Sequence, residues 1–379
     1  VPARAHEAFP SFDQPDLKAR FRLTLEVPAA WRAVSNTPRE SERTTNGRRM
    51  VEFQRTEPLP TYVFSFAAGR FEVEAARRNG RTIRIFHRET DSVKVARNRE
   101  AVFDLHARSL SRMEEYTGIS YPFDKFDVVL IPSFQYGGME HAGAILYDAS
   151  NLYLDRSATQ ADRLGRASLI AHETAHMWFG DLVTMEWFDD VWMKEVFANF
   201  MAAKIVRPAF PELNHDLRFL LDHYPAAYSV DRTEGTHPIR QELGNLSDAG
   251  TLYGALIYDK APIVMRQLEA LIGEDGMRTG LREYLDENRW GNAGWPELIR
   301  ILDARDDRDL AAWSRVWVEE AGRPVLTVTA ERASAGDGLR SLVLRQEDPL
   351  GRDRSWTQRL HLGLGYPDGE LRRIPVELS

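Results

Sequence analysis

The stretch RASLIAHETAHMWFGDLVT occupies residues 166–184, and WMKE follows at residues 192–195. Apolar residues in the first stretch recur near the helical period, which predicts a helix. His172 and His176 lie four residues apart, so their side chains share one face of that helix. Gly180 is typical of a helix C-terminal cap. A second helix is expected to begin near 189–190, where two aspartates suit an N-cap.

The two histidines and one later carboxylate make a complete set of metal ligands. A catalytic zinc ion takes three protein ligands and leaves one position open for water, and His172, His176 and Glu195 would be the three. Enough chain separates His176 from Glu195 for one helix to end and a second to return beside it. Glu173 lies between the histidines, where a general base is expected. Manganese or cobalt would suit the same ligands.

A chance His-Glu-x-x-His is expected in roughly a few per cent of chains of this composition, usually on a solvated helix face. Here the motif lies in an aromatic and apolar setting, and polar groups in such a setting need partners or a metal. The sequence therefore favours the metal site. The nearby aromatic residues are Trp178, Phe179, Trp187 and Phe188.

Five blocks resemble one known family. Residues 172–184 resemble the zinc signature of the aminopeptidase N and leukotriene hydrolase family of gluzincins, and residues 187–195 resemble its second zinc block. Three further blocks follow the family's order: FPSFDQP at 9–15, GGMEH at 137–141 and YDKA at 258–261. The resemblance implies a zinc aminopeptidase with one zinc ion, which removes single residues from peptides that have a free N-terminus.

The resemblance also implies roles for particular residues. Glu173 would take a proton from the attacking water and pass it to the leaving amine. Tyr258 would donate a hydrogen bond to the developing oxyanion. Glu140 would pair with the α-amine of the substrate, so that only the first peptide bond reaches the water. The expected substrate-binding residues are Gly137, Gly138, Met139 and Glu140.

Some of these residues also have ordinary structural interpretations. Tyr258 ends an apolar run at 252–258, where a tyrosine more often belongs to the core, and Tyr253 is the competing candidate. A single glutamate such as Glu140 is usually a solvated charge. Its position after two glycines, which permit close backbone approach, favours the edge of a cleft.

The chain also departs from the family pattern. His141 stands where the family has Asn, and Val196 and Ala261 each stand where it has Gly. An acidic or amide residue that helps to hold the substrate amine would fall at or before residue 1. We therefore expect the chain to lack the first part of the family's N-terminal domain, and also its C-terminal helical domain.

Composition limits the remaining possibilities. The 379 residues carry a net charge of −8, which argues against nucleic-acid binding, and they include no cysteine, which excludes disulfides and thiolate metal sites. No run of 18 apolar residues is present, so no membrane span is predicted. The compartment, the oligomeric state and the preferred N-terminal residue of the substrate stay open.

The expected fold class is α+β and multidomain, with a thermolysin-like catalytic domain of mixed sheet plus helical lobe. Alternating residues predict the end of an N-terminal β-domain at 1–72 and a small C-terminal β-sandwich at 323–379. The catalytic domain would span 73–322, with helices from Leu164 onward and Pro262 in a helix first turn. Expected strands lie at 21–27, 62–66, 83–87, 127–131, 325–329 and 341–344, with a turn at Asn46-Gly47.

Three other functions fit the sequence less well than an aminopeptidase does. A catalytically silent relative that binds peptides or acts as a scaffold would be expected to have lost metal residues, yet all are present. An epoxide hydrolase would need an apolar tunnel, for which no pattern is visible. A zinc protease that cuts internal bonds is disfavoured by Glu140.

Overall fold

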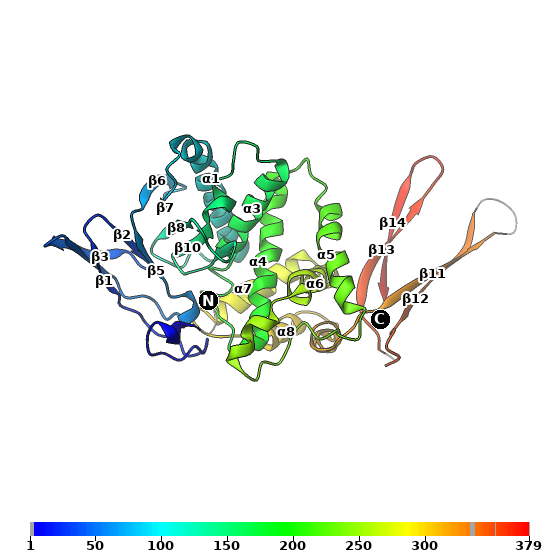
Figure 1. Cartoon of the computed structure of the whole chain (residues 1–379). Helices are drawn as coiled ribbons and strands as arrows, with labels where there is room; N and C mark the ends of the chain where they lie inside the picture. The colour runs from blue at the N-terminus through cyan, green and yellow to red at the C-terminus, as the bar shows by residue number, and fades with distance from the viewer. Residues whose placement is uncertain (1–3, 334–337, 353, 379) are drawn as a thin grey trace. The chain divides into compact units, whose positions relative to one another are not determined.

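The computed structural model describes residues 4–333, 338–352 and 354–378 (Figure 1). The chain divides into two compact units. The first unit comprises Val1–His215, Leu243–Thr251 and Leu281–Glu297. The second comprises Asp216–Glu242, Leu252–Gly280 and Leu298–Ser379. The domain boundaries expected at 72 and 322 stay predictions.

The first unit opens with two small antiparallel sheets. One has the strand order β1-β4-β3 and the other pairs β2 with β5. Asn46 and Gly47 join β3 to β4 with φ of 52° and 73°, the left-handed pair that a tight hairpin turn requires, so the predicted turn is confirmed. The strands are β1 (Thr24–Pro28), β2 (Arg32–Ser35), β3 (Arg39–Thr45), β4 (Arg48–Phe53) and β5 (Phe66–Gly69).

The strand expected at residues 62–66 is wrong. Residues Thr61–Val63 form a 3₁₀ turn, and β5 begins only at Phe66, the last residue of the predicted strand. Residues distant in the chain hold this turn. The Asn36 side chain donates to the Val63 carbonyl at 2.9 Å, and the Tyr62 hydroxyl donates to the Gly180 carbonyl at 3.0 Å. Tertiary contacts thus override the local alternation.

A five-stranded mixed sheet, ordered β6-β7-β8-β10-β9, forms the centre of the first unit. Strands β7, β8 and β10 are parallel neighbours, and β8 is almost wholly buried, as expected of a central strand. The strands predicted at 83–87 and 127–131 are confirmed. The bounds are β6 (Glu72–Arg78), β7 (Arg81–His87), β8 (Phe126–Ile131), β9 (Gly138–Met139) and β10 (Ala144–Asp148).

Two longer helices contact this sheet, and a third packs against them. Helix α1 (Ser92–Thr117) contacts β6 and α3 (Gln160–Ala175), and α3 packs along α4 (Val191–Val206), as Figure 1 shows in the cyan and green parts of the chain. Thr159 and Asp162 form a capping box at the start of α3. The short helix α2 is Ala149–Leu152.

The predicted ends of these two helices need correction. Helix α3 is capped by His176, not by Gly180, whose φ of 133° lies in the turn that follows. Helix α4 begins at Val191, near the expected residue, but the Asp190 side chain makes no capping bond to it. Asp189 instead accepts a hydrogen bond of 2.6 Å from the Leu243 backbone. Neither change moves His172 or His176 off their shared face.

The later part of the chain is helical and then returns to strands. Pro262 lies in the first turn of α6 (Ala261–Ile272), as predicted. The other helices are α5 (His215–Asp231), α7 (Glu274–Glu287), α8 (Trp295–Asp303) and α9 (Leu310–Ser314). No helix among the described residues has the length and apolar character to cross a bilayer.

The described C-terminal strands form two antiparallel hairpins. One pairs β11 (Val325–Arg332) with β12 (Leu339–Glu347), and the other pairs β13 (Gln358–Gly365) with β14 (Leu371–Leu378). Both predicted C-terminal strands lie inside the first hairpin. The expected α+β multidomain class, with β-structure at each end and a mixed sheet plus helices between, is confirmed.

Candidate metal centre and active site

His172 of α3 and His176, the C-cap of that helix, face one another through their Nε2 atoms. These atoms are 3.0 Å apart. The His172 Nδ1 lies 2.9 Å from the Asn199 side-chain oxygen, and the His176 Nδ1 lies 3.0 Å from the Phe179 carbonyl. Because those oxygens accept the Nδ1 protons, each Nε2 presents a lone pair. Two lone pairs so close repel unless a proton or a metal ion lies between them, so the pair can bind a metal ion.

Glu195 of α4 completes this group. Its Oε2 lies 3.5 Å from His172 Nε2 and 3.9 Å from His176 Nε2. The residue is 5% exposed, so the carboxylate needs a partner. One atom from each of these three residues lies within 4.8 Å of the others. The close packing of α3 on α4 produces this convergence, and two imidazoles with one carboxylate are a donor set that zinc accepts.

A second possible cluster shares one of these residues. Glu140, Glu173 and His176 also lie within 4.8 Å of one another. It contributes a single imidazole, whereas the first cluster contributes two. The first cluster therefore suits a metal ion better, and the second describes the wall beside it.

Glu173 lies in this wall with little solvent contact. The residue is 4% exposed, and its Oε2 is buried without a hydrogen-bond partner among the described residues. Burial raises the pKa of Glu173 to about 8; His172 opposes this rise, and the carboxylates of Glu140 and Glu195 add to it. A carboxylate with such a pKa readily takes a proton near neutral pH.

The glycine-rich block forms the edge strand β9 opposite Glu173. Strand β9 pairs antiparallel with β10, where Met139 faces Leu146 in the register. A side chain at Gly138 would collide with the Glu173 carboxylate, whereas one at Gly137 would meet only an ordinary contact, 3.5 Å from Leu169. Gly138 therefore allows the backbone to approach the carboxylate.

Glu140 follows this strand and is 4% exposed. Burial would raise the pKa of Glu140, but the Lys194 ammonium and His176 more than offset it and lower the pKa to about 2. The side chain therefore carries a negative charge beside the two histidines. The structure thus brings the residues predicted from both zinc blocks and from the glycine-rich block into one group.

Tyr258 belongs to the second compact unit. It lies in a π-helical turn, Leu256–Lys260, and its ring stacks on Tyr253 with centroids 6.2 Å apart. Single π-helical turns occur often at functional sites. Within that unit, Lys260 is 2.9 Å from the Asp231 carboxylate and donates to the Gly322 carbonyl at 2.8 Å, which anchors the end of the turn. The role of Tyr258 stays a prediction.

Two family patterns match this chain. The peptidase family M1 domain covers residues 101–317, and the peptidase M1 N-terminal domain covers residues 2–63. The chain belongs to peptidase family M1. The first match contains α3, α4 and the π-helical turn, so the M1 domain includes the whole candidate metal centre.

Several M1 relatives are similar over most of this chain. Aminopeptidase N of Streptomyces lividans is 32% identical over 350 residues, which is 91% of this chain and 40% of that protein. Leucyl aminopeptidase of Saccharolobus solfataricus is 32% identical over 91% of this chain and 44% of its own length. Aminopeptidase M1-D of Oryza sativa subsp. japonica is 31% identical over 86% of this chain and 37% of its own length. The chain thus spans about two fifths of these relatives.

Two residues beside the M1 site escaped the sequence analysis. Asn199 orients His172, and Lys194 bonds to Glu140 and Glu195. Asn199 lies four residues after Glu195, so the helical spacing could have placed it on the same face. No comparable signal marked Lys194, because a lysine beside a ligand is usually solvated.

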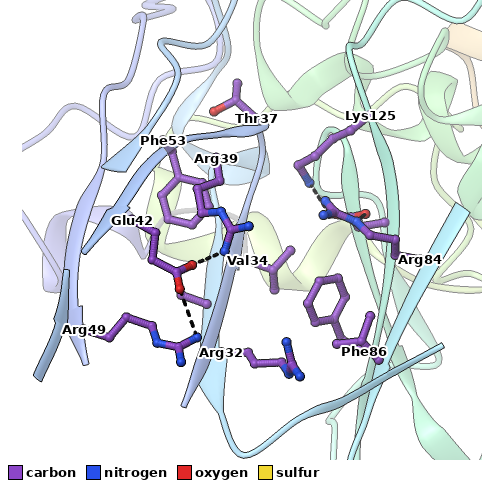
Figure 2. Close-up of a pocket in the computed structure, with 13 residues that line it drawn as sticks. Arg32, Val34, Thr37, Arg39, Glu42, Arg49, Phe53, Arg84, Phe86 and Lys125 are labelled. Atoms are coloured by element: carbon purple, nitrogen blue, oxygen red, sulfur yellow. Dashed lines mark hydrogen bonds and ion pairs between the residues drawn. The ribbon is translucent and has the colours of Figure 1, made fainter. Parts of the chain in front are cut away.

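The M1 chain also has a pocket of about 110 Å³ between the N-terminal strands and the mixed sheet (Figure 2). Asp127, on β8, accepts two hydrogen bonds of 2.7 Å from Arg84 and one of 2.8 Å from Lys125. Figure 2 shows Arg39 and Arg49 turned toward Glu42 on the opposite wall. The two carboxylates of the pocket thus bind most of the cationic side chains that line it, so we interpret the pocket as a structural ion-pair network.

Proposed function

We propose that this chain carries the catalytic site of a zinc-dependent aminopeptidase. The observation that carries the proposal is the convergence of His172 Nε2, His176 Nε2 and Glu195 Oε2, with each imidazole oriented by an oxygen at its other nitrogen. The names of the similar M1 proteins support the same activity.

The residues of the site divide the chemistry between them. A bound zinc ion supplies Lewis acidity to the scissile carbonyl and lowers the pKa of water. Glu173 accepts the proton of the attacking water and returns it to the leaving amine, and its burial keeps competing solvent away. Tyr258 would donate its hydroxyl proton in a hydrogen bond to the oxyanion.

Glu140 would select peptides with a free N-terminus. Its buried carboxylate lies in the same wall as Glu173 and offers a negative partner to the substrate's α-ammonium group. An ammonium group bound there fixes which peptide bond lies beside Glu173. Gly138 and Met139 belong to the edge strand that leads to this carboxylate, and a substrate chain would lie along that edge.

A panel of amino-acid 4-nitroanilides with free and with acetylated α-amines tests the proposal. We expect cleavage of the free-amine forms only, lost with a chelator and restored by zinc. Equal cleavage of acetylated forms would indicate an internal-bond protease and exclude the role of Glu140. Zinc binding without any cleavage would indicate a peptide-binding relative. If manganese or cobalt restored activity and zinc did not, the proposed metal would be wrong.

A further inference from the structure

Lys194 occupies an unusual place for a lysine. It precedes Glu195 on α4, and its side chain is 8% exposed. The Nζ atom lies 2.8 Å from Glu140 Oε1 and also bonds to Glu195 Oε1. One ammonium group therefore joins the carboxylate proposed for the substrate amine to the carboxylate proposed for the metal.

The two oxygens of Glu195 have different partners. Oε1 accepts from Lys194, whereas Oε2 faces the two histidines at 3.5 and 3.9 Å. Lys194 and a metal ion therefore do not compete for the same oxygen. A carboxylate held at one oxygen cannot rotate freely, so the lysine fixes the direction in which Oε2 points.

The charges around the lysine give it a second effect. Glu140, Glu173 and Glu195 are all buried in this wall. Like charges repel strongly where water is excluded, so two of these carboxylates would separate or bind protons without a nearby cation. The Lys194 ammonium group lies between Glu140 and Glu195 and opposes their repulsion.

The lysine is itself held in position. Its Nζ atom lies 5.8 Å from the centre of the Tyr62 ring, a distance that allows a cation–π contact. The Tyr62 hydroxyl donates to the Gly180 carbonyl at 3.0 Å, and the lysine stem passes close to the same glycine. Contacts along its length therefore direct the ammonium group to the two carboxylates.

We propose that Lys194 is a positioning residue that holds Glu140 ready for the substrate's α-ammonium group and Glu195 ready for the metal. The proposal rests on the proposed aminopeptidase function for its first half only. The metal half stands on the geometry of Glu195 alone. The lysine acts through its contacts with both glutamates.

Lys194→Met removes the charge and keeps most of the stem, whereas Lys194→Arg keeps the charge. For Lys194→Met we expect a KM for free-amine 4-nitroanilides raised about tenfold. We also expect zinc affinity, measured by competition with a chromophoric chelator, to fall about ten- to a hundredfold. The visible spectrum of bound cobalt should shift as the Glu195 geometry changes. Lys194→Arg should recover part of each loss.

Two controls separate positioning from general damage. Lys204→Met changes another lysine of α4, which lies over the Phe200 ring, and should leave KM and zinc affinity unchanged. In a Glu140→Gln background, Lys194→Met should raise KM no further, because the group through which it acts has lost its charge. A full additional rise in KM would overturn the link to Glu140.

A separate result would contradict the proposed effect of Lys194 on metal binding. Unchanged zinc affinity and an unchanged cobalt spectrum in Lys194→Met would overturn it. A lower melting temperature with neither effect would show a structural role only and overturn the whole proposal. If the wild-type chain binds zinc but cleaves no free-amine substrate, the proposed function fails, and the zinc affinity and cobalt spectrum still decide the metal half.

Discussion

The backbone of Gly138 lies directly against the carboxylate of Glu173. A Cβ atom at position 138 would lie 2.6 Å from Glu173 Cδ and 2.7 Å from Cγ, closer than such atoms approach in proteins. The backbone there has no positive φ, so space rather than conformation requires the glycine. The edge strand and the proposed base are therefore fitted to each other.

Gly138→Ala should displace Glu173 and lower kcat. A misplacement of about 1 Å at a catalytic group costs about a hundredfold in rate, and zinc content should stay unchanged because neither histidine is touched. Gly137→Ala is the comparison at the neighbouring position, since its added methyl would make only ordinary contacts, 3.5 Å from Leu169 and 3.6 Å from Asn151. Equal loss in both variants would show that the strand, not the contact with Glu173, is being disturbed.

Glu173→Gln should separate catalysis from metal binding. The amide cannot accept the proton, so kcat should fall between about 100- and 10,000-fold, while zinc per chain stays near the wild-type value. Glu195→Gln should instead reduce the zinc content, because the amide lacks the charge that faces the histidines. Measuring kcat and metal content of both variants checks this, and zinc loss in Glu173→Gln would contradict it.

Tyr258→Phe should lower kcat by about 100- to 1,000-fold, which is the usual effect of removing one oxyanion donor. Tyr253→Phe is the comparison, because its ring stacks on Tyr258 and Tyr253 is the competing candidate for this role. Steady-state kinetics with a free-amine 4-nitroanilide distinguish the two. A larger loss in Tyr253→Phe would transfer the proposed role to that residue.

Asp127→Asn should destabilise the first unit. The carboxylate is 1% exposed and binds Arg84 and Lys125, so its neutralisation leaves a buried ammonium group without its counter-charge. A loss of about 3 kcal/mol in the free energy of unfolding is expected. Asp124→Asn, at an exposed position nearby, should change it little. Urea unfolding at pH 7 measures both, and equal stabilities would refute the role of the network.

His106 should make the fold sensitive to acid. Burial lowers the pKa of His106 from 6.5 to about 4, and the hydrogen bond of its ring to the Val102 carbonyl only partly opposes this. The unfolded chain therefore binds a proton first as the pH falls, and stability present above pH 6.5 is lost progressively toward pH 4.

At pH 5 this loss amounts to about 2 kcal/mol from His106 alone. His106→Gln, which cannot titrate, should lose correspondingly less stability than the wild type between pH 7.5 and 5 in urea unfolding. Other buried histidines such as His141 contribute to the total in both proteins, so the difference between them isolates His106. Identical losses in the two proteins would show that this ring is not the titrating group.

Much of the candidate site was predictable because it depends on local spacing. His172 and His176 share a face of any α-helix, and the Asn46-Gly47 pair specifies a tight turn wherever it joins two strands. The strands at 83–87 and 127–131 were likewise predicted from the sequence. These features follow from backbone geometry and from neighbours within a few residues.

The sequence by itself determined the ligand types, their spacing and the α+β class. Only the tertiary structure decided that residues 62–66 bend into a 3₁₀ turn and that Gly138 faces Glu173. It also decided that Lys194, a residue without any sequence signal, lies between two carboxylates. Each of these depends on side chains that are distant in the chain and meet only when helices and strands pack, and local periodicity carries no information about such meetings.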